Sequence, residues 1–419
     1  MSKSIKIVLI FLVVAGVVGV GVYFGTKDNV QPGSPTTTEG ETSLPGIQAG
    51  EQGTSELPTQ TGTTGEQQEF TYNTPEEVAP VAGTKILYKE PVLGFTPTAD
   101  GGVLLVSKNG TIVSVSPSGD RKELNSSGIE NALEATFSTD GKKILLTYGK
   151  NTTPQFSVYD VASSTWQPLL ADTAASLRPK THEVVYLYEK SGVKNLFLWN
   201  LDKPKSTPQQ ISSLQIEDPI LSWKDKDTLL IQQRPSAYTK DTLLSFNLSK
   251  KIVTPIIQDK YALNSIWNEA GSSGLVFYGD NTYRGGALRL YLAGGEEGSK
   301  LTLVTLTEKC SFYHSAGFFS TSTPKTTASS TALAQKNELY CAIPRDSKTF
   351  RYAILPDDFY RGTISTSDDL IKINLDDGSL GVILSPTDAS LEIYKPFAGE
   401  KEIYFIDKRT GALYSVPNK

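Results

Sequence analysis

Residues 345–369 hold the side chains whose types and spacing best fit a binding surface. The segment RDSKTFRYAILPDDFYRGTISTSDD places aromatic rings, arginines and paired aspartates within a few positions of one another. Aromatic and arginine side chains are enriched where proteins bind partners, so we predict a recognition loop. The alternative is an insertion whose aromatic side chains pack against its own structural unit. The candidate binding residues are Phe350, Arg351, Tyr352, Asp357, Asp358, Phe359, Tyr360 and Arg361.

The two cysteines of the chain, Cys310 and Cys341, precede this segment. They fall in two consecutive expected strands, and neighbouring antiparallel strands bring such residues within bridging distance. In an exported domain we predict a disulfide, which would contribute roughly 3–4 kcal/mol by restricting the unfolded chain. The alternative is a pair of small buried thiols.

Patterns for catalysis, cofactors and metals are missing or incomplete. We find no G-x-S-x-G nucleophile motif and no glycine-rich phosphate loop. The two histidines belong to different repeats: we expect His182 to be solvated in a turn, and a zinc site from His314 and the cysteines would lack a fourth ligand. We therefore predict no catalytic residue, no cofactor and no metal site. The paired aspartates, which do not follow the EF-hand pattern, are Asp357-Asp358, Asp368-Asp369 and Asp376-Asp377.

The elements that must position these residues repeat along the chain. Phe137 to Leu170 contains the aromatic end of a strand, an Asp-Gly turn, an apolar strand, a loop and two further strands. The same order recurs in degraded form from about residue 84 to the C-terminus, with apolar second strands about 40 to 65 residues apart. The copies of the first two strands are FTPTADGGVLLV (95–106), FSTDGKKILLT (137–147), LRPKTHEVVYL (177–187), WKDKDTLLI (223–231), WNEAGSSGLVFY (267–278) and FAGEKEIYFI (397–406).

Four short strands per unit, about seven times, predict an all-β, seven-bladed β-propeller over residues 84–419. An irregular β-sandwich is the alternative. The final unit supplies only three strands, 391–397, 402–407 and 412–417, whereas an extra strand at 85–90 precedes the first unit. We predict that the extra strand joins the last blade and closes the ring, which removes an exposed sheet edge.

The Phe137-Ser-Thr-Asp-Gly-Lys segment resembles the F-S-x-D-G-K signature of TolB-like, or WD40-like, β-propeller repeats. The resemblance covers roughly residues 85–419, although only this blade keeps the whole signature; the first blade keeps Asp100-Gly101. It implies a propeller that acts mostly as a binding platform, and it implies little about the ligand. The Asp-Gly pair itself suits a tight turn between strands and has a structural role.

The residues before the repeats predict a membrane anchor and a stalk. Residues 5–25 include about 20 mostly apolar positions, enough for one helix to cross a bilayer, and Lys3 and Lys6 place the tail of residues 1–4 in the cytoplasm. A cleaved signal peptide is the alternative. Residues 26–83 are rich in Gly, Thr, Pro and Glu, which predicts a disordered acidic stalk.

These observations predict a single-pass membrane protein whose propeller faces out of the cell. The net charge of −5 is small for 419 residues and predicts no nucleic-acid partner. We expect a non-enzymatic binding or scaffold module of the cell envelope, held to the membrane by its N-terminal helix, with an envelope protein or glycan as its partner. The alternative is an extracytoplasmic hydrolase or lyase that acts on glycan or peptide in the propeller cleft.

Overall fold

The computed structural model describes residues 80–125, 128–282, 285–315, 336–387 and 390–419. The chain divides into two units, 1–64 and 65–419, and every described residue belongs to the second. The expected anchor at 5–25 and almost all of the expected stalk at 26–83 lie outside the described residues. Among the residues that are described, no helix is both long and apolar enough to cross a membrane.

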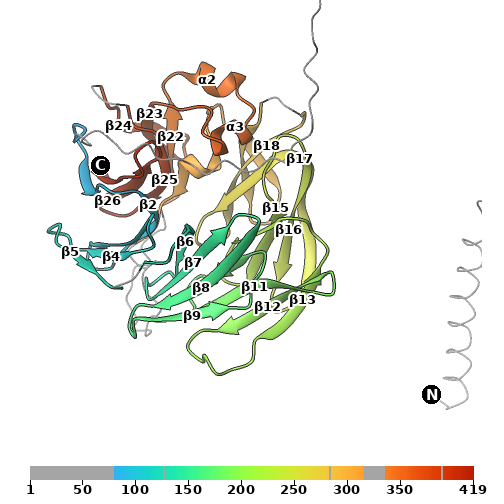
Figure 1. The fold of residues 1–419 in the computed structure, drawn as a ribbon. Coiled ribbons are helices and arrows are strands. Elements are labelled where there is room, and N and C mark those ends of the chain that lie inside the picture. Colours follow the sequence, from blue (N-terminus) through green and yellow to red (C-terminus); the bar gives the residue numbers. More distant parts are fainter. Residues whose placement is uncertain (1–79, 126–127, 283–284, 316–335, 388–389) are drawn as a thin grey trace, which may run out of the picture. The chain divides into compact units, whose positions relative to one another are not determined.

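Nearly all regular elements of the described chain are β-strands, and the strands of each sheet pair in antiparallel fashion (Figure 1). The first three sheets each contain four strands that follow one another in the chain. Sheet 1 comprises β2 (Val92–Pro97), β3 (Val103–Ser107), β4 (Ile112–Val115) and β5 (Arg121–Glu123). Sheet 2 comprises β6 (Ala132–Phe137), β7 (Lys143–Lys150), β8 (Thr153–Asp160) and β9 (Thr165–Leu169). Sheet 3 comprises β10 (Ala175–Leu177), β11 (Glu183–Lys190), β12 (Val193–Asn200) and β13 (Gln209–Leu214).

The next sheet has seven strands because one long strand, β17 (Ile252–Trp267), belongs to two four-stranded halves. Its first residues pair with β16 and its last residues pair with β18. We call the halves sheets 4 and 5. Sheet 4 comprises β14 (Pro219–Trp223), β15 (Thr228–Gln233), β16 (Lys240–Asn247) and the start of β17. Sheet 5 comprises the end of β17, β18 (Ser273–Gly279), β19 (Ala287–Leu292) and β20 (Glu297–Lys300).

The helices of the described chain adjoin sheet 6. In sheet 7 the first strand of the described chain pairs with the last. The short 3-10 helix η1 (Thr307–Lys309) leads into sheet 6, and α2 (Ser347–Tyr352), which contacts β22, and α3 (Asp357–Tyr360) follow β22 in the chain (Figure 1). Sheet 6 comprises β21 (Cys310–Phe312), β22 (Glu338–Pro344), β23 (Asp368–Asn374) and β24 (Leu380–Leu384). Sheet 7 comprises β25 (Ile393–Ala398), β26 (Glu402–Asp407), β27 (Leu413–Pro417) and β1 (Lys85–Tyr88).

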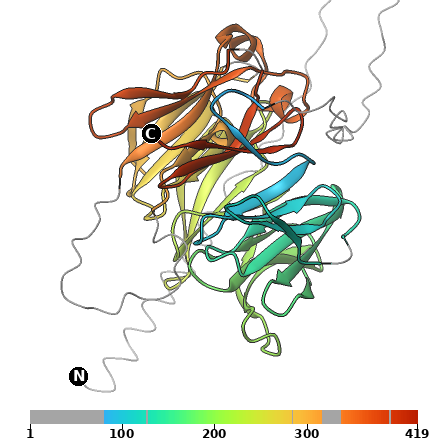
Figure 2. The ribbon, with the colours of Figure 1, turned by 90° about the vertical axis from the view of Figure 1, so that its left-hand side faces the viewer.

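The strand expected at 85–90 is β1, and it is antiparallel to the last strand of the chain. Lys85 pairs with Ser415 and Ile86 pairs with Tyr414. In Figure 2 the blue β1 runs alongside the red C-terminal strands. Three of the four strands of sheet 7 therefore come from the end of the sequence and one from its beginning.

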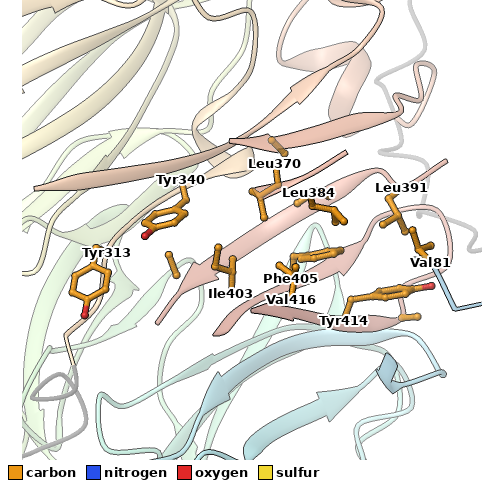
Figure 3. Packing of buried hydrophobic residues seen from close by; sticks show 14 residues of the cluster. Val81, Tyr313, Tyr340, Leu370, Leu384, Leu391, Ile403, Phe405, Tyr414 and Val416 are labelled. Carbon is orange, nitrogen blue, oxygen red and sulfur yellow. The ribbon is translucent and has the colours of Figure 1, made fainter. Parts of the chain in front are cut away.

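The hydrophobic core is divided among contacts between consecutive sheets. One cluster packs sheet 6 against sheet 7, where Val81 lies beside Leu391 and the rings of Phe405 and Tyr414 stack at 5.6 Å (Figure 3). Other clusters join sheets 1 and 2, 2 and 3, 3 and 4, 4 and 5, and 5 and 6. A further cluster joins sheet 7 to sheet 1 through residues such as Leu413 and Val92. Within the described residues, each sheet thus packs against two others.

Candidate binding site

A cavity of about 450 Å³ collects one segment from every sheet. Its lining comes from β2, β6, β10, β14, the end of β17 and β25, together with His314, two residues after β21. These are the first strands of their sheets, and β17 is the first strand of sheet 5. The first strands therefore surround a common space, which we call the axial pocket.

Five aromatic rings stand in the walls of the axial pocket. The pocket-lining rings stand at the end of the first strand of their sheets, the position that opens each repeat in the sequence. Sheet 3 places Leu177 at this position. Each of these rings is only partly buried, so it presents surface to the cavity. The rings are Phe95, Phe137, Trp223, Trp267 and Phe397.

Trp267 shows how closely one wall is constructed. A Cβ atom on Gly274 would lie 2.7 Å from the indole ring, so only glycine lets the ring lie flat on β18. The ammonium of Lys224 lies 4.6 Å from the centroid of the same ring, a distance suited to a cation–π interaction. Burial lowers the pKa of Lys224. Within the described chain, the buried indole nitrogens of Trp223 and Trp267 have no hydrogen-bond partner.

An ion pair crosses the pocket further back along the strands. Lys395 Nζ of β25 lies 3.1 Å from Glu134 Oε1 of β6, and these strands belong to sheets 7 and 2, with sheet 1 between them. The positive charge of Lys395 keeps the pKa of Glu134 below its ordinary value. Glu134 still exposes 55% of its side-chain surface, as expected for a group that faces a cavity.

The other carboxylates of the pocket are also engaged. Glu269 forms an ion pair with Lys180, and Asp225 accepts a hydrogen bond from the backbone N–H of Asp227 at 2.8 Å. Arg178 at the pocket forms ion pairs with Glu183 and with Asp227. The lining therefore combines apolar rings with charges that largely balance one another.

His314 contributes a neutral ring to this wall. Its imidazole stacks on Phe397 with centroids 4.3 Å apart and planes 10° from parallel, and its backbone N–H donates to the carbonyl of Ala398. Burial lowers the pKa of His314 to about 4, so the imidazole is uncharged at neutral pH. Within the described ranges, no group of three or more His, Cys, Asp or Glu side chains is arranged to hold a metal ion.

The predicted recognition loop is placed differently from the axial pocket, and two of its aromatic residues face inward. Phe350 is 1% exposed and Phe359 is 0% exposed, and both belong to the core between sheets 5 and 6. Both rings lie over the ammonium of Lys309, at 5.3 and 5.4 Å. A ring enclosed in this way cannot contact a partner, so these two positions follow the alternative in which the insertion packs on its own sheet.

Three other residues of the loop hold it in place. Asp357 accepts hydrogen bonds from Ser236 Oγ and from the backbone N–H of Ala237, and Asp358 accepts one from the backbone N–H of Ile354. The hydroxyl of Tyr360 donates to Glu308, and burial raises the pKa of Tyr360 well above its ordinary value. Arg351, Tyr352 and Arg361 are exposed and the three residues just named are half-buried, so recognition by these six residues stays a prediction.

Cys310 and Cys341 stand directly opposite each other on β21 and β22 and form a disulfide with an Sγ–Sγ distance of 2.09 Å. Both residues are buried, and they join strands on either side of residues 316–335. Because both sulfurs are bonded to each other, neither is available as a metal ligand for His314.

The expectation of a solvated His182 was wrong. Its side chain is only 15% exposed, and its two nitrogens face carboxylates from two sheets: Nε2 lies 3.0 Å from Asp140 Oδ2 and Nδ1 lies 2.9 Å from Asp202 Oδ2. Asp140 belongs to the Asp-Gly turn of the best-preserved repeat and also accepts from Ser138 Oγ. This turn therefore joins sheets 2 and 3. A second cavity of about 500 Å³ adjoins the network at Asp202, where the lining charges pair with one another.

The axial pocket is the site that sequence reasoning missed. Its signal was present in the repeats, because five of the six copies open on an aromatic residue. These aromatic residues, which occupy the first position of their repeats, helped to define the repeat and were not considered as a binding surface. Knowing that first strands meet at an axis would have turned it into a site prediction.

Successive antiparallel sheets whose first strands surround a common axis define a β-propeller protein. The predicted resemblance to TolB-like and WD40-like propellers is confirmed at the level of the fold. Solved structures similar to this chain include an oligogalacturonate lyase in complex with manganese, which is 11% identical, has a TM-score of 0.50 and matches 83% of this chain and 96% of its own.

Two further similar structures have lower TM-scores. TolB from Acinetobacter baumannii is 16% identical with a TM-score of 0.36, and the match covers 50% of this chain and 53% of the TolB chain. The β-propeller domain of the Trilobed protease from Pyrococcus furiosus is 11% identical with a TM-score of 0.48, covering 81% of this chain and 95% of that domain. No family model matches the sequence. No curated protein matches it either.

Proposed function

We propose that this chain is a membrane-anchored, non-enzymatic binding module of the cell envelope, whose propeller holds its ligand in the axial pocket. The observation that carries the proposal is the convergence of five aromatic rings from separate sheets on one cavity. Exposed ring surface of this kind provides large apolar contact area at small entropic cost. The partner is an envelope protein or an envelope glycan.

The architecture proposed is a ring of seven blades closed by β1. Support comes from the inter-sheet clusters, which link each sheet to the next and sheet 7 back to sheet 1. The pairing of β1 with β27 supplies sheet 7 with its fourth strand. The division of β17 between two sheets gives seven four-stranded blades from the sheets of the described chain.

The proposed location rests on the N-terminal sequence. Residues 5–25 are long and apolar enough for a single membrane-spanning helix, and the lysines at positions 3 and 6 favour a cytoplasmic N-terminus. The acidic segment that follows would hold the propeller away from the outer surface of the membrane. The propeller then meets its partner outside the cytoplasm.

The hydrolase or lyase alternative has less support at this pocket. General acid–base chemistry needs a carboxylate or histidine within reach of the reacting group and able to exchange a proton. Glu134 and Glu269 are each held in an ion pair, and burial disfavours the protonated form that His314 would need as a general acid. The geometry offers surfaces for stacking more readily than groups for proton transfer.

The test uses the full-length protein and soluble peptidoglycan fragments, which carry both glycan and peptide. Calorimetric titration of the wild type should show binding, and Trp267→Ala should weaken it about tenfold, the loss expected for one aromatic platform. Trp199→Ala is the matched control, because this indole belongs to β12 and donates to the carbonyl of Ser206 away from the pocket. Far-ultraviolet circular dichroism verifies that both variants fold.

Separate titrations with N-acetylglucosamine oligomers and with stem peptides assign the ligand class. A pull-down from envelope extract, compared between wild type and Trp267→Ala, covers protein partners. If neither the fragments nor any envelope protein distinguishes wild type from Trp267→Ala, the binding proposal is wrong. Shortening of the fragments during incubation would establish the enzyme alternative.

A further inference from the structure

The outward face of α2 is the most exposed apolar and basic feature of the insertion. Tyr352 exposes 87% of its surface, more than any other large hydrophobic residue of the described chain. Lys348, Arg351 and Tyr352 stand at positions i, i+3 and i+4 of one helix, so their side chains share a face. The buried Phe350 fixes that helix to the core and turns this face outward. We call Lys348, Arg351 and Tyr352 the α2 face.

The charges of the α2 face are not neutralised by the rest of the described chain. Neither Lys348 nor Arg351 forms an ion pair with another described residue. The nearest acidic positions are already committed: Asp346 caps α2 by accepting from the backbone N–H of Lys348, and Asp369 pairs with Arg345. The α2 face therefore fits an acidic partner that also brings an apolar or aromatic side chain.

Such a segment exists in the same chain. Residues 66–79, EQQEFTYNTPEEVA, carry Glu66, Glu69, Glu76 and Glu77 with two aromatic residues and no lysine or arginine. They lie outside the described residues and join them at Pro80. Their composition, acidic with interspersed rings, is the complement of the α2 face.

The junction lies close to the base of the insertion. Val81 belongs to the same hydrophobic cluster as Leu384. The next residue along the chain, Ser385, accepts a hydrogen bond from Arg345, which is two residues before α2 begins. An extended chain covers about 3.3–3.6 Å per residue, so fourteen residues can span roughly 46 Å and reach α2 from Pro80.

We propose that the α2 face is a docking surface for the acidic residues 66–79 of its own chain. The glutamates pair with Lys348 and Arg351 while an aromatic ring of the segment packs against Tyr352. This contact is independent of the axial pocket and of its ligand. It makes the last part of the acidic segment an intramolecular partner of the propeller.

Zero-length carbodiimide cross-linking of the full-length protein tests the contact, because it joins a carboxylate to a lysine amine only when they touch. Mass spectrometry should find links from residues 66–79 to Lys348 at least fivefold more often than to Lys122. Lys122 is the matched control because it is exposed on β5, beside Arg121, which donates to the carbonyl of Leu87 and so lies near the same junction. The yield at Lys348 should fall severalfold between about 20 mM and 500 mM NaCl, since salt screens exposed charges.

Two variants test the charge and the apolar part of the contact, and a third is a control for the assignment of the link. Arg351→Glu and Tyr352→Ser should each lower the yield at Lys348, and Lys348→Arg should remove that link while leaving links to Lys122 unchanged. Equal yields at Lys348 and Lys122, or a yield that neither variant nor salt alters, would overturn the proposal. So would mixed-mass links that approach half of all links when equal amounts of isotopically labelled and unlabelled chains are combined, because random links between two copies give that share and links within one copy give none.

Discussion

At the scale of single residues, burial shows which side chains of the insertion, residues 345–369, have a structural role. Lys309 and Asp368 form an ion pair at 2.7 Å, and the side chains of both are 0% exposed. Asp368 also accepts from the backbone N–H of Ile393, and Lys309 donates to Thr366. Loss of one member of a buried ion pair leaves the other charge uncompensated and destabilises the protein. The rings of Phe350 and Phe359 cover the Lys309 ammonium, so we expect them to contribute to stability here.

Phe359→Ala should lower the free energy of unfolding by about 3–5 kcal/mol. The ring is fully buried and its centroid lies 3.7 Å from the ammonium of Lys408, so its removal opens a cavity beside the buried Lys309 and the half-buried Lys408. Urea denaturation followed by circular dichroism measures the change. Tyr352→Ala, on the exposed side of the same insertion, should change stability by less than about 0.5 kcal/mol. Similar losses in the two variants would contradict the inward placement of Phe359.

The protonation of His314 should make stability depend on pH. Burial lowers the pKa of the His314 imidazole in the folded protein to about 4, from an ordinary value of 6.5. Between about pH 4 and pH 6.5 the imidazole is therefore protonated in the unfolded chain and neutral in the folded protein. The stabilising contribution is complete above about pH 6.5 and is lost as the pH falls towards 4, by up to about 3 kcal/mol. His314→Phe keeps a ring against Phe397, and the difference in unfolding free energy between it and wild type should follow this curve. A difference that is constant from pH 4 to 7 would argue against the buried neutral imidazole.

At the scale of elements, the positions of the strands could be predicted from the sequence. The sheets against which each strand packs could not. Alternating apolar runs and Asp-Gly turns located the first two strands of most repeats, and the surplus strand at 85–90 corresponds to β1. The same local patterns cannot report which face of a strand meets another sheet, because that depends on partners far away in the sequence. Thus Phe350 and Phe359 resembled exposed binding residues, and the aromatic column at the axis resembled a folding signal.

Removal of β1 should destabilise the propeller far more than its length suggests. Leu87 and Tyr88 of β1 are buried in the cluster between sheets 7 and 1, and β27 would lose its outer hydrogen-bonding partner. We expect the melting temperature to fall by about 10 °C or more when residues 84–91 are deleted from the full-length protein. Differential scanning calorimetry provides the measurement, and replacement of Lys122 and Glu123, exposed residues of the outer strand β5, by serine is the control. Melting at the wild-type temperature would sink the closure model.

At the scale of the whole molecule, the repeat determined what sequence reasoning could recover. The fold could be predicted by counting the repeated units, because they share one strand order although their sequences differ. The site could not, because each sheet contributes between one and six of the lining residues and no single segment contains the site. The N-terminal residues remain predictions, since they lie outside the described structure.

The orientation in the membrane has a direct test. If residues 1–4 are cytoplasmic and the propeller is outside, a protease added to intact cells after removal of any outer barrier should release the propeller by cutting within residues 26–79. The described domain should resist, because its strands are paired and buried. An antibody against the C-terminus follows the fragment. Protection of the full-length chain until the cells are lysed would place the propeller on the cytoplasmic side.

The pairing of β1 with β27 also has a consequence for how the chain could be reconnected. Lys85 lies opposite Ser415 on an antiparallel strand, so the start of β1 and the end of β27 meet at the same end of this strand pair. A few residues linking Lys419 to Thr84 would turn this joint into an ordinary hairpin, and new ends could then be opened between other sheets. The resulting circular permutants should fold, except where the cut falls inside β17, because that strand serves two sheets without a break.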